Sequence, residues 1–100
     1  MKRFRVSPQA RLDIEDICTY VAADDLDAAL RLLSRFESAL AKLERHPGLG
    51  HTRHDLADRR HRFWSVGSYL VVYLVLADRV EVARVIHAAR NIRRVLDEEE

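Results

Sequence analysis

The chain has 100 residues, of which 48% are hydrophobic and 33% are charged, and its formal net charge at pH 7 is +1. This length suits one domain, residues 1–100, with a single modest core, and the composition is that of a globular protein rather than a disordered one. No apolar run approaches the ~20 residues of a membrane span, and the N-terminus lacks the apolar segment of a secretory signal. Cys18 is the single cysteine, so no internal disulfide can form. We therefore expect a cytoplasmic protein without a membrane partner.

The basic residues are unevenly distributed along the chain. Residues 59–94 contain eight arginines but only two acidic residues, Asp78 and Glu81, whereas residues 97–100 are all acidic. A basic patch on a nearly neutral protein indicates a local anionic partner rather than general affinity for nucleic acid. We therefore expect no direct sequence-specific DNA binding from this chain alone.

The chain opens with the pattern of a strand followed by a helix. Residues 2–6 alternate polar and apolar side chains, as a short strand does. Ser7 is a preferred helix N-cap, and the proline that follows it is favoured at the first helical position. These signals predict a helix over residues 8–23, whose apolar side chains recur at helical spacing, with Asp13 and Asp16 on another face.

A second helix is expected to begin after residues 24–25, two aspartates that can both cap it, and to end near Arg45, before a proline and two glycines. The two helices are joined by so few residues that they should form an antiparallel hairpin. The apolar stripe of the second helix, most of which we expect in the core, consists of Leu26, Leu30, Leu33, Phe36, Leu40 and Leu43. Because Leu12, Leu32 and Ala39 fall off that stripe, part of the hairpin surface should remain apolar.

The second half of the chain predicts an antiparallel meander. Residues 69–76 are an unbroken run of β-branched, aliphatic and aromatic side chains, which is typical of a strand covered on both faces. Gly67 and Ser68 suit a two-residue turn from a preceding strand at 60–66, and a third strand should return at 80–86.

The remaining segments complete an α+β fold. Residues 51–60 are polar and lack periodicity, so we expect a loop, and the spacing of residues 88–96 predicts a short C-terminal helix. The order is then β-α-α-β-β-β-α, with the helical hairpin packed on a mainly antiparallel sheet. His51, His54 and His61 are irregularly spaced with no cysteine nearby, so we expect neither a metal site nor a cofactor.

Several short motifs follow one another in a characteristic order. The first half of the chain carries Phe4-Arg-Val-Ser7-Pro8-x-Ala10-x-x-Asp13-Ile14-x-x-Ile17-x-x-Tyr20 and then His46-Pro47-Gly48-Leu49-Gly50-His-Thr-Arg53. The second half carries Arg62-x-x-x-Val66-Gly67-x-Tyr69-x-x-x-Tyr73 and closes with Arg84-Val85-Ile86-His87-Ala88-Ala89-Arg90. This ordered set covers nearly the whole chain and resembles the ParE toxins of the RelE/ParE superfamily of toxin–antitoxin systems.

The resemblance implies a type II toxin that a cognate ParD-like antitoxin holds inactive by direct binding. ParE toxins are associated with poisoning DNA gyrase, so that replication stalls and DNA breaks accumulate, and the chain is then a gyrase inhibitor without catalytic residues. The target-binding candidates are Arg62, Arg84, His87 and Arg90. The antitoxin-binding candidates are Leu12, Leu32, Phe36, Ala39, Arg60 and Trp64. Replacing Leu32 with Glu is expected to weaken antitoxin binding and to leave the fold intact.

Two alternatives remain open. RelE relatives cleave mRNA in the ribosomal A site with basic residues and often a tyrosine or histidine, and the four target-binding candidates are of the right types for that chemistry. In those nucleases an arginine typically stands three residues before the tyrosine that corresponds to Tyr73, where this chain has Leu70. The missing arginine favours the gyrase-directed interpretation. The other alternative is a relative that binds an antitoxin without being toxic.

Three of the target-binding candidates also have structural interpretations. Arg84 lies in the third predicted strand, where it is either buried against a carboxylate or exposed on the working face of the sheet, since burial without a partner would cost several kcal/mol. His87 and Arg90 lie where that strand meets the C-terminal helix. His87 either makes a backbone hydrogen bond or contacts a target, and Arg90 either packs over the sheet edge or contacts a target.

Overall fold

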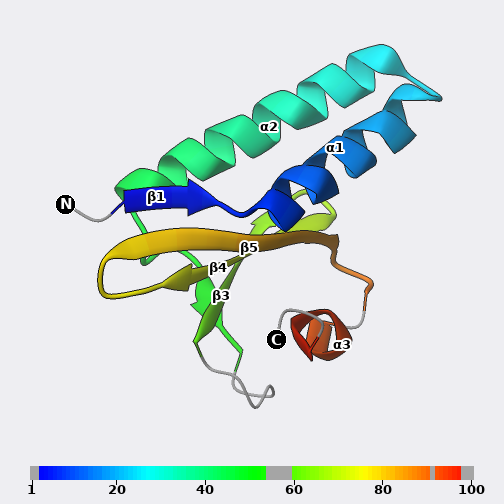
Figure 1. Ribbon diagram of the computed structural model, residues 1–100. Coiled ribbons are helices and arrows are strands. Elements are labelled where there is room, and N and C mark those ends of the chain that lie inside the picture. The colour runs from blue at the N-terminus through cyan, green and yellow to red at the C-terminus, as the bar shows by residue number, and fades with distance from the viewer. Residues whose placement is uncertain (1–2, 54–59, 91, 98–100) are drawn as a thin grey trace.

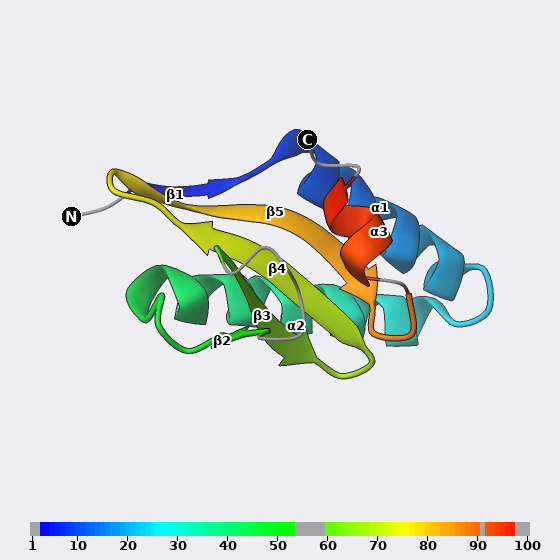
Figure 2. The same ribbon diagram turned by 90° about the horizontal axis from the view of Figure 1, so that it is seen from below.

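The computed structural model describes residues 3–53, 60–90 and 92–97, which form a five-stranded sheet and three helices (Figure 1). In chain order the elements are β1 (Arg3–Val6), α1 (Pro8–Ala22), α2 (Leu26–Arg45), β2 (His51–Thr52), β3 (His61–Val66), β4 (Tyr69–Val75), β5 (Arg79–His87) and α3 (Ile92–Asp97). The strand order across the sheet is β1-β5-β4-β3-β2. Helices α1 and α2 cover one face of the sheet, and α3 lies against the other face (Figures 1 and 2).

The strand pairings confirm the predicted α+β fold with a mainly antiparallel sheet. β3, β4 and β5 form the expected antiparallel meander, and β1 joins β5 as a parallel edge strand. In the turn between β3 and β4, Gly67 has a φ of +58°, a value that glycine adopts without steric cost. The predicted turn position is therefore confirmed.

Both predicted helix N-caps are present. The Oγ of Ser7 accepts a hydrogen bond from the Ala10 N–H at 3.0 Å, and Oδ1 of Asp25 accepts one from the Ala28 N–H at 3.0 Å. The Ser7 hydroxyl also donates to the Ala83 carbonyl at 2.9 Å, so the residue that starts α1 also attaches it to β5.

The predicted loop over residues 51–60 is wrong at its start, where β2 forms. His51 pairs with Phe63 and Thr52 pairs with Arg62 in an antiparallel ladder with β3. A two-residue strand is too short to show periodicity in a sequence, so pairing with an available strand edge decides its conformation. Residues 54–59 of that predicted loop lie outside the described residues.

The C-terminal helix begins at Ile92 rather than at the predicted Ala88. Local hydrogen bonds hold the intervening residues in turns: the Ala88 N–H donates to the Ser68 carbonyl at 2.9 Å, and the Arg90 N–H donates to the His87 carbonyl at 3.0 Å. These bonds use backbone groups that a continuous helix from residue 88 would direct elsewhere.

Two apolar cores lie on the two faces of the sheet. The larger one, under α1 and α2, includes Ala10, Phe36, Leu43, Val66, Val71, Tyr73, Val82 and Val85. The smaller one, under α3, consists of Phe63, Val72, Ile86 and Val95. β4 contributes side chains to both cores, which confirms the prediction of a strand covered on both faces.

A β-bulge on β5 changes which way its side chains face. The register with β4 shifts at Ala83, which has no opposite residue in the ladder. Val82 and Val85 both belong to the core under α1 and α2, whereas Ile86 belongs to the core under α3. The bulge therefore interrupts the strict alternation of side chains that a regular strand would show around Arg84.

Candidate functional site

Arg84 is buried in an ion pair with Asp13 of α1. The Nε of Arg84 lies 2.8 Å from Oδ2 of Asp13 and the Nη2 lies 3.2 Å from Oδ1, and the two side chains are 8% and 10% exposed. Two parallel N–H···O bonds give this pair a fixed geometry as well as charge neutralisation. Of the two alternatives for Arg84, the structure contains the buried ion pair.

The same carboxylate completes the edge of β5. β1 pairs with β5 only as far as Val82. Beyond that point the Val85 N–H donates to Oδ2 of Asp13 at 2.9 Å, and the Ala83 carbonyl accepts from the Ser7 hydroxyl. The side chains of Asp13 on α1 and of its N-cap Ser7 thereby satisfy backbone groups that an unpaired strand edge would leave without partners.

A cavity of about 200 Å³ lies beside this ion pair at the end of β5. Its walls are formed by Asp13, Asp16, Ile17, Tyr69, Val85, Ile86, His87 and Arg90. His87 and Arg90 are exposed, so the structure brings these two target-binding candidates together at one cavity. Arg84 is connected to the cavity through Asp13.

Two neighbours orient the His87 ring. Its Nδ1 accepts a hydrogen bond from the Ala89 N–H at 3.0 Å, which assigns the proton of a neutral ring to Nε2. The Tyr69 ring packs edge-on against it, with centroids 5.4 Å apart and an interplanar angle of 82°. The backbone hydrogen bond expected for His87 is therefore present, and it leaves Nε2 of an exposed ring for other contacts.

Asp16 lines the cavity although the sequence did not single it out as a site residue. It follows Asp13 by three residues on α1, so the two carboxylates lie on the same side of the helix. The spacing of these aspartates was the available signal. It could be interpreted only once the fold placed His87 and Arg90 at the same cavity.

Arg62 lies away from this cavity. It pairs with Tyr73 on β4, four residues beyond Tyr69, which is the partner of His87. At ~3.3 Å per residue, this separation is about 13 Å along the strand. The Nη1 of Arg62 instead donates to the Gly50 carbonyl at 3.0 Å. The structure therefore separates Arg62 from the other target-binding candidates.

The hydroxyl of Tyr73 is fully buried and has two hydrogen-bond partners. It donates to the Pro47 carbonyl at 2.7 Å and accepts from the Gly50 N–H at 2.7 Å. Burial raises the pKa of the Tyr73 phenol, although the Gly50 N–H and the charge of Arg62 act in the opposite direction. The phenol is therefore neutral at pH 7 and fastens the segment after α2 to β4.

The antitoxin-binding candidates differ in exposure. Leu12 and Arg60 are exposed, Leu32 and Trp64 are half-buried, and Phe36 and Ala39 are buried. Phe36 is 0% exposed, and Ala39, at 8%, forms only the floor of a groove, so the expectation of two surface side chains is wrong. Leu32 is half-buried and packs against the core under α1 and α2, so the structure leads us to expect that Leu32→Glu destabilises the fold rather than leaving it intact.

The exposed apolar side chains of α2 lie on a different side of the helix from Phe36 and Ala39. Leu26, Leu30 and Leu33 are 62%, 55% and 37% exposed, whereas Ala29 and Leu43 on the same helix are buried. The tip of the helical hairpin projects beyond the sheet (Figure 2), so the first turns of α2 have mainly α1 to pack against. The expected core position of these three leucines is therefore wrong.

Within residues 3–53, 60–90 and 92–97, no helix is long and apolar enough to cross a membrane. The same part of the chain holds no group of three or more His, Cys, Asp or Glu side chains that could bind a metal ion. His54, one of the histidines considered for such a site, lies outside the described residues.

Known proteins are similar to this chain in sequence and in fold. The model of the family described as the ParE toxin of the type II toxin–antitoxin system parDE matches residues 4–92. Toxin ParE1 of Caulobacter vibrioides is 33% identical over 94 residues, which are 93% of this chain and 96% of that protein.

Two solved structures share the fold at low sequence identity. The chromosomal ParDE toxin–antitoxin system from P. aeruginosa gives a TM-score of 0.75 at 13% identity, with 87% of this chain and 96% of that chain covered. The YoeB dimer from Staphylococcus aureus gives 0.59 at 15% identity, with 86% and 95% covered. The family match over most of its length and the 33% identical relative show that this chain belongs to the ParE toxin family of type II toxin–antitoxin systems.

Proposed function

We propose that this protein inhibits DNA gyrase and that a cognate ParD-like antitoxin neutralises it by direct binding. Membership of the ParE family supports both parts. The observation that carries the non-catalytic mode of action is the environment of Tyr73. RelE-type nucleases often use a tyrosine to activate the RNA, but here the hydroxyl is buried and bonded to Pro47 and Gly50 at 2.7 Å each.

The other candidate groups for RNA cleavage also lie apart. That reaction needs a base, an acid and cationic groups that converge on one phosphate. Arg62 is bonded to the segment after α2, Arg84 is bonded to Asp13, and His87 and Arg90 line the cavity at the end of β5. This separation supports inhibition through surface contacts rather than cleavage.

His87 and Arg90 are the proposed contacts with the target. Both are exposed, and Arg90 can present its five N–H donors to a carboxylate or phosphate group. Arg84 acts through Asp13: the ion pair holds the end of β5 against α1 and so fixes the wall from which His87 projects. Arg84 is therefore a positioning residue, whereas His87 and Arg90 make the contacts.

The proposed antitoxin surface is the exposed apolar side of α2. Leu26, Leu30 and Leu33 follow one another at helical spacing and are exposed together, which is how a surface for an amphipathic partner segment is built. Leu12 and Arg60 remain predicted antitoxin contacts, because both are exposed.

The experiment that tests the mode of action induces the chain without antitoxin and follows protein synthesis and DNA breaks over the first minutes. Gyrase inhibition predicts that breaks accumulate while pulse-labelled translation continues. Prompt translational arrest with intact DNA would reject the proposal in favour of RNA cleavage. A folded protein that changes neither quantity would identify a non-toxic relative.

The contact residues are tested in the same assay with Arg90→Ala and His87→Ala. Each variant is expected to reduce the rate of break formation at least ten-fold. Arg31→Ala is the matched control, because Arg31 is exposed on α2 and does not line the cavity. Equal break formation by all three variants would show that the cavity at the end of β5 does not contact the target.

A further inference from the structure

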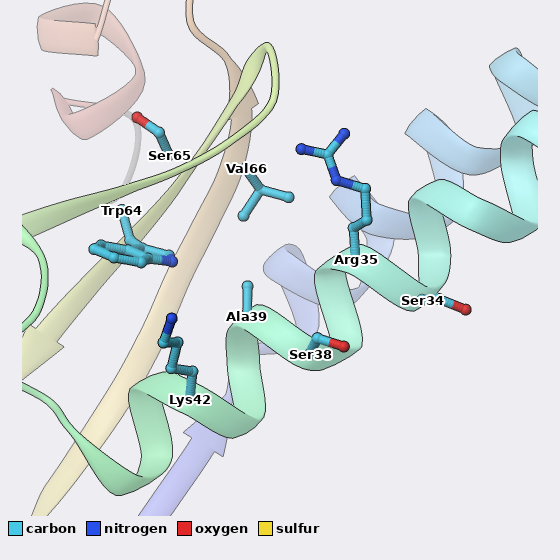
Figure 3. Close-up of a pocket in the computed structure, with 8 residues that line it drawn as sticks. All are labelled: Ser34, Arg35, Ser38, Ala39, Lys42, Trp64, Ser65 and Val66. Atoms are coloured by element: carbon cyan, nitrogen blue, oxygen red, sulfur yellow. The ribbon is translucent and has the colours of Figure 1, made fainter.

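A second hollow lies between α2 and β3, and it is lined by Ala39 and Trp64, two of the antitoxin-binding candidates that the surfaces proposed above do not use. This open groove has a volume of about 370 Å³ and is lined by Ser34, Arg35, Ser38, Ala39, Lys42, Trp64, Ser65 and Val66. Figure 3 shows Lys42 directed towards the Trp64 ring and Arg35 directed towards the β3–β4 hairpin, with Ala39 and Val66 between them. One wall is therefore a single side of a helix, and the other is a strand.

The strand wall is an open sheet edge in the part of the chain that the structure describes. β2 pairs with β3 only at Arg62 and Phe63, so the rest of β3 has no recorded strand neighbour on that side. Val66 and Tyr69 close the two-residue hairpin and form a hydrogen-bonded pair, and antiparallel pairs alternate. The backbone N–H and C=O of Ser65 therefore point away from β4 and into the groove.

The side chains around this edge are basic. Arg35 and Lys42 both line the groove, and no carboxylate does. Neither side chain has a salt bridge within the described residues. The Nζ of Lys42 lies 5.8 Å from the centre of the Trp64 ring, and Nη1 of Arg35 would lie 3.1 Å from a Cβ placed on Gly67. The two cations thus flank the open edge at its two ends.

The open strand edge beside the groove favours an extended segment over a helix. A strand added to a sheet lies ~4.8 Å from its neighbour and pairs with it through main-chain bonds. A helix uses its N–H and C=O groups internally except at its ends, so it cannot pair in this way with the outward-facing N–H and C=O of Ser65.

We propose that this groove binds an extended acidic segment of the antitoxin, which adds a strand to the open edge of β3 at Ser65. The backbone of the segment would pair with Ser65, and its carboxylates would meet Arg35 and Lys42. Such strand addition derives affinity from main-chain bonds and specificity from the flanking side chains. This inference rests on the proposed function, because the segment belongs to the antitoxin, but it concerns a surface separate from the exposed leucines of α2.

The backbone part of the proposal is tested by a matched pair of substitutions at one position. Ser65→Pro removes the N–H that faces the groove, and because this N–H is not bonded to β4, the β3–β4 ladder keeps its hydrogen bonds. Ser65→Ala keeps the N–H. The probe is the product of the reading frame adjoining the one that encodes this chain. Ser65→Pro is expected to weaken its binding at least ten-fold, and Ser65→Ala is expected to change it less than three-fold.

Hydrogen exchange of the wild-type complex gives a readout that does not depend on whether Ser65→Pro folds. The Ser65 amide is expected to exchange at least ten-fold more slowly in the complex than in the isolated chain. The Val66 amide, which is already bonded to β4, serves as the internal reference. Unchanged exchange at Ser65 in a formed complex would overturn the proposal.

The charged part is tested with the Arg35→Glu, Lys42→Glu double variant. Reversal of both charges is expected to weaken binding at least ten-fold and to reduce its dependence on salt concentration. Arg31→Glu, on the same helix but outside the groove, is the control and should change binding less than three-fold. Unchanged binding by the double variant would show that the antitoxin does not bind in this groove, without contradicting antitoxin binding at another surface.

Other occupants have their own signatures in these experiments. If millimolar inorganic phosphate displaced the antitoxin while Ser65→Pro had no effect, the groove would be a site for small anions. If Ser65 became protected with increasing concentration of the isolated chain, the occupant would be a second copy of this chain. Either result would overturn the inference. Failure of the wild-type chain to bind the probe at all would reject the proposed antitoxin partnership together with it.

Discussion

The carboxylate of Asp13 accepts three hydrogen bonds that join α1 to the second half of β5. Two come from the Arg84 guanidinium and one from the Val85 N–H, across 71 and 72 positions of the sequence. One acidic side chain thereby neutralises a buried cation and satisfies a strand edge. The loss of such a partner is costly because it leaves both a charge and a backbone donor without an acceptor.

Asp13→Ala is therefore expected to lower the free energy of unfolding by about 3–5 kcal/mol, the range for a buried pair that loses one partner. Urea denaturation followed by circular dichroism measures the change. Asp16→Ala is the control: Asp16 is exposed on the same helix, and its replacement should shift the value by no more than ~0.5 kcal/mol. Equal effects of the two variants would contradict a structural role for the Asp13–Arg84 pair.

Tyr73 imposes a second constraint at a single residue, Gly50. A Cβ on Gly50 would lie 2.5 Å from the Tyr73 hydroxyl oxygen and 2.6 Å from its ring, and that ring is fully buried. The side chain cannot move aside without breaking its bonds to Pro47 and Gly50. Glycine is required here by the close approach of a neighbour rather than by its own φ.

Gly50→Ala is expected to destabilise the protein by about 1–3 kcal/mol, as overpacking of a filled core does. Gly48→Ala is the matched control two residues earlier, because a Cβ there meets nothing within 4 Å. Thermal unfolding of both variants tests the contrast. A melting temperature for Gly50→Ala equal to that of Gly48→Ala would show that the Tyr73 side chain can move aside at little cost in stability.

At the scale of one element, α2 carries two apolar sides with different roles. One side is turned inward, with Ala29 buried and with Leu32 and Phe36 in the larger core, and the other presents Leu30 and Leu33 to solvent. The sequence joins both sides into one stripe because leucines occur at helical spacing on each. The end of the sheet, over which the hairpin tip projects, decides which leucines are covered.

The pair Leu30→Glu and Leu32→Glu separates these sides. Leu30→Glu should leave the free energy of unfolding within ~0.5 kcal/mol of wild type, because it replaces an exposed side chain. Leu32→Glu should cost at least ~2 kcal/mol, because it places a carboxylate against an apolar core. Urea denaturation tests both values, and Leu30→Glu is the variant in which weaker antitoxin binding can be interpreted. Similar stability of the two variants would contradict this division of α2.

At the scale of the whole molecule, the sheet is covered on both faces by helices of unequal size. α1 and α2 cover the larger core, whereas the six-residue α3 covers Phe63, Val72 and Ile86 with Val95 (Figure 1). The cavity at the end of β5 lies where β5 leads into α3, and the groove lined by Arg35, Lys42 and Trp64 lies between α2 and β3. A toxin of this size thus has room for a target and an antitoxin segment at separate places.

Truncation after Arg90 is expected to expose the core under α3. Full burial of each large aliphatic or aromatic side chain contributes ~1.5–3 kcal/mol, so removal of the cover should lower the free energy of unfolding by about 3 kcal/mol or more. Urea denaturation measures the loss, and binding of a dye specific for apolar surface should increase. An unchanged denaturation midpoint without dye binding would show that α3 is not needed for this face.

The element order apart from β2, both helix N-caps and the Gly67 turn followed from the sequence by itself, because each depends on neighbours within a few positions. The same holds for the covered strand β4, whose side chains are apolar throughout. The β5 cavity was partly predictable, since His87 and Arg90 lie three residues apart near the end of one strand. The ordered motifs also predicted the ParE family, which the comparisons confirm.

Only the tertiary structure decided which faces are buried and which distant residues meet. The partner of Arg84 is 71 positions away, and the Tyr73 hydroxyl meets the Pro47 carbonyl across 26 positions. The bulge at Ala83 decides which side chains of β5 face each of the two cores. These features depend on where one element ends relative to another, and local propensities contain no information about that position.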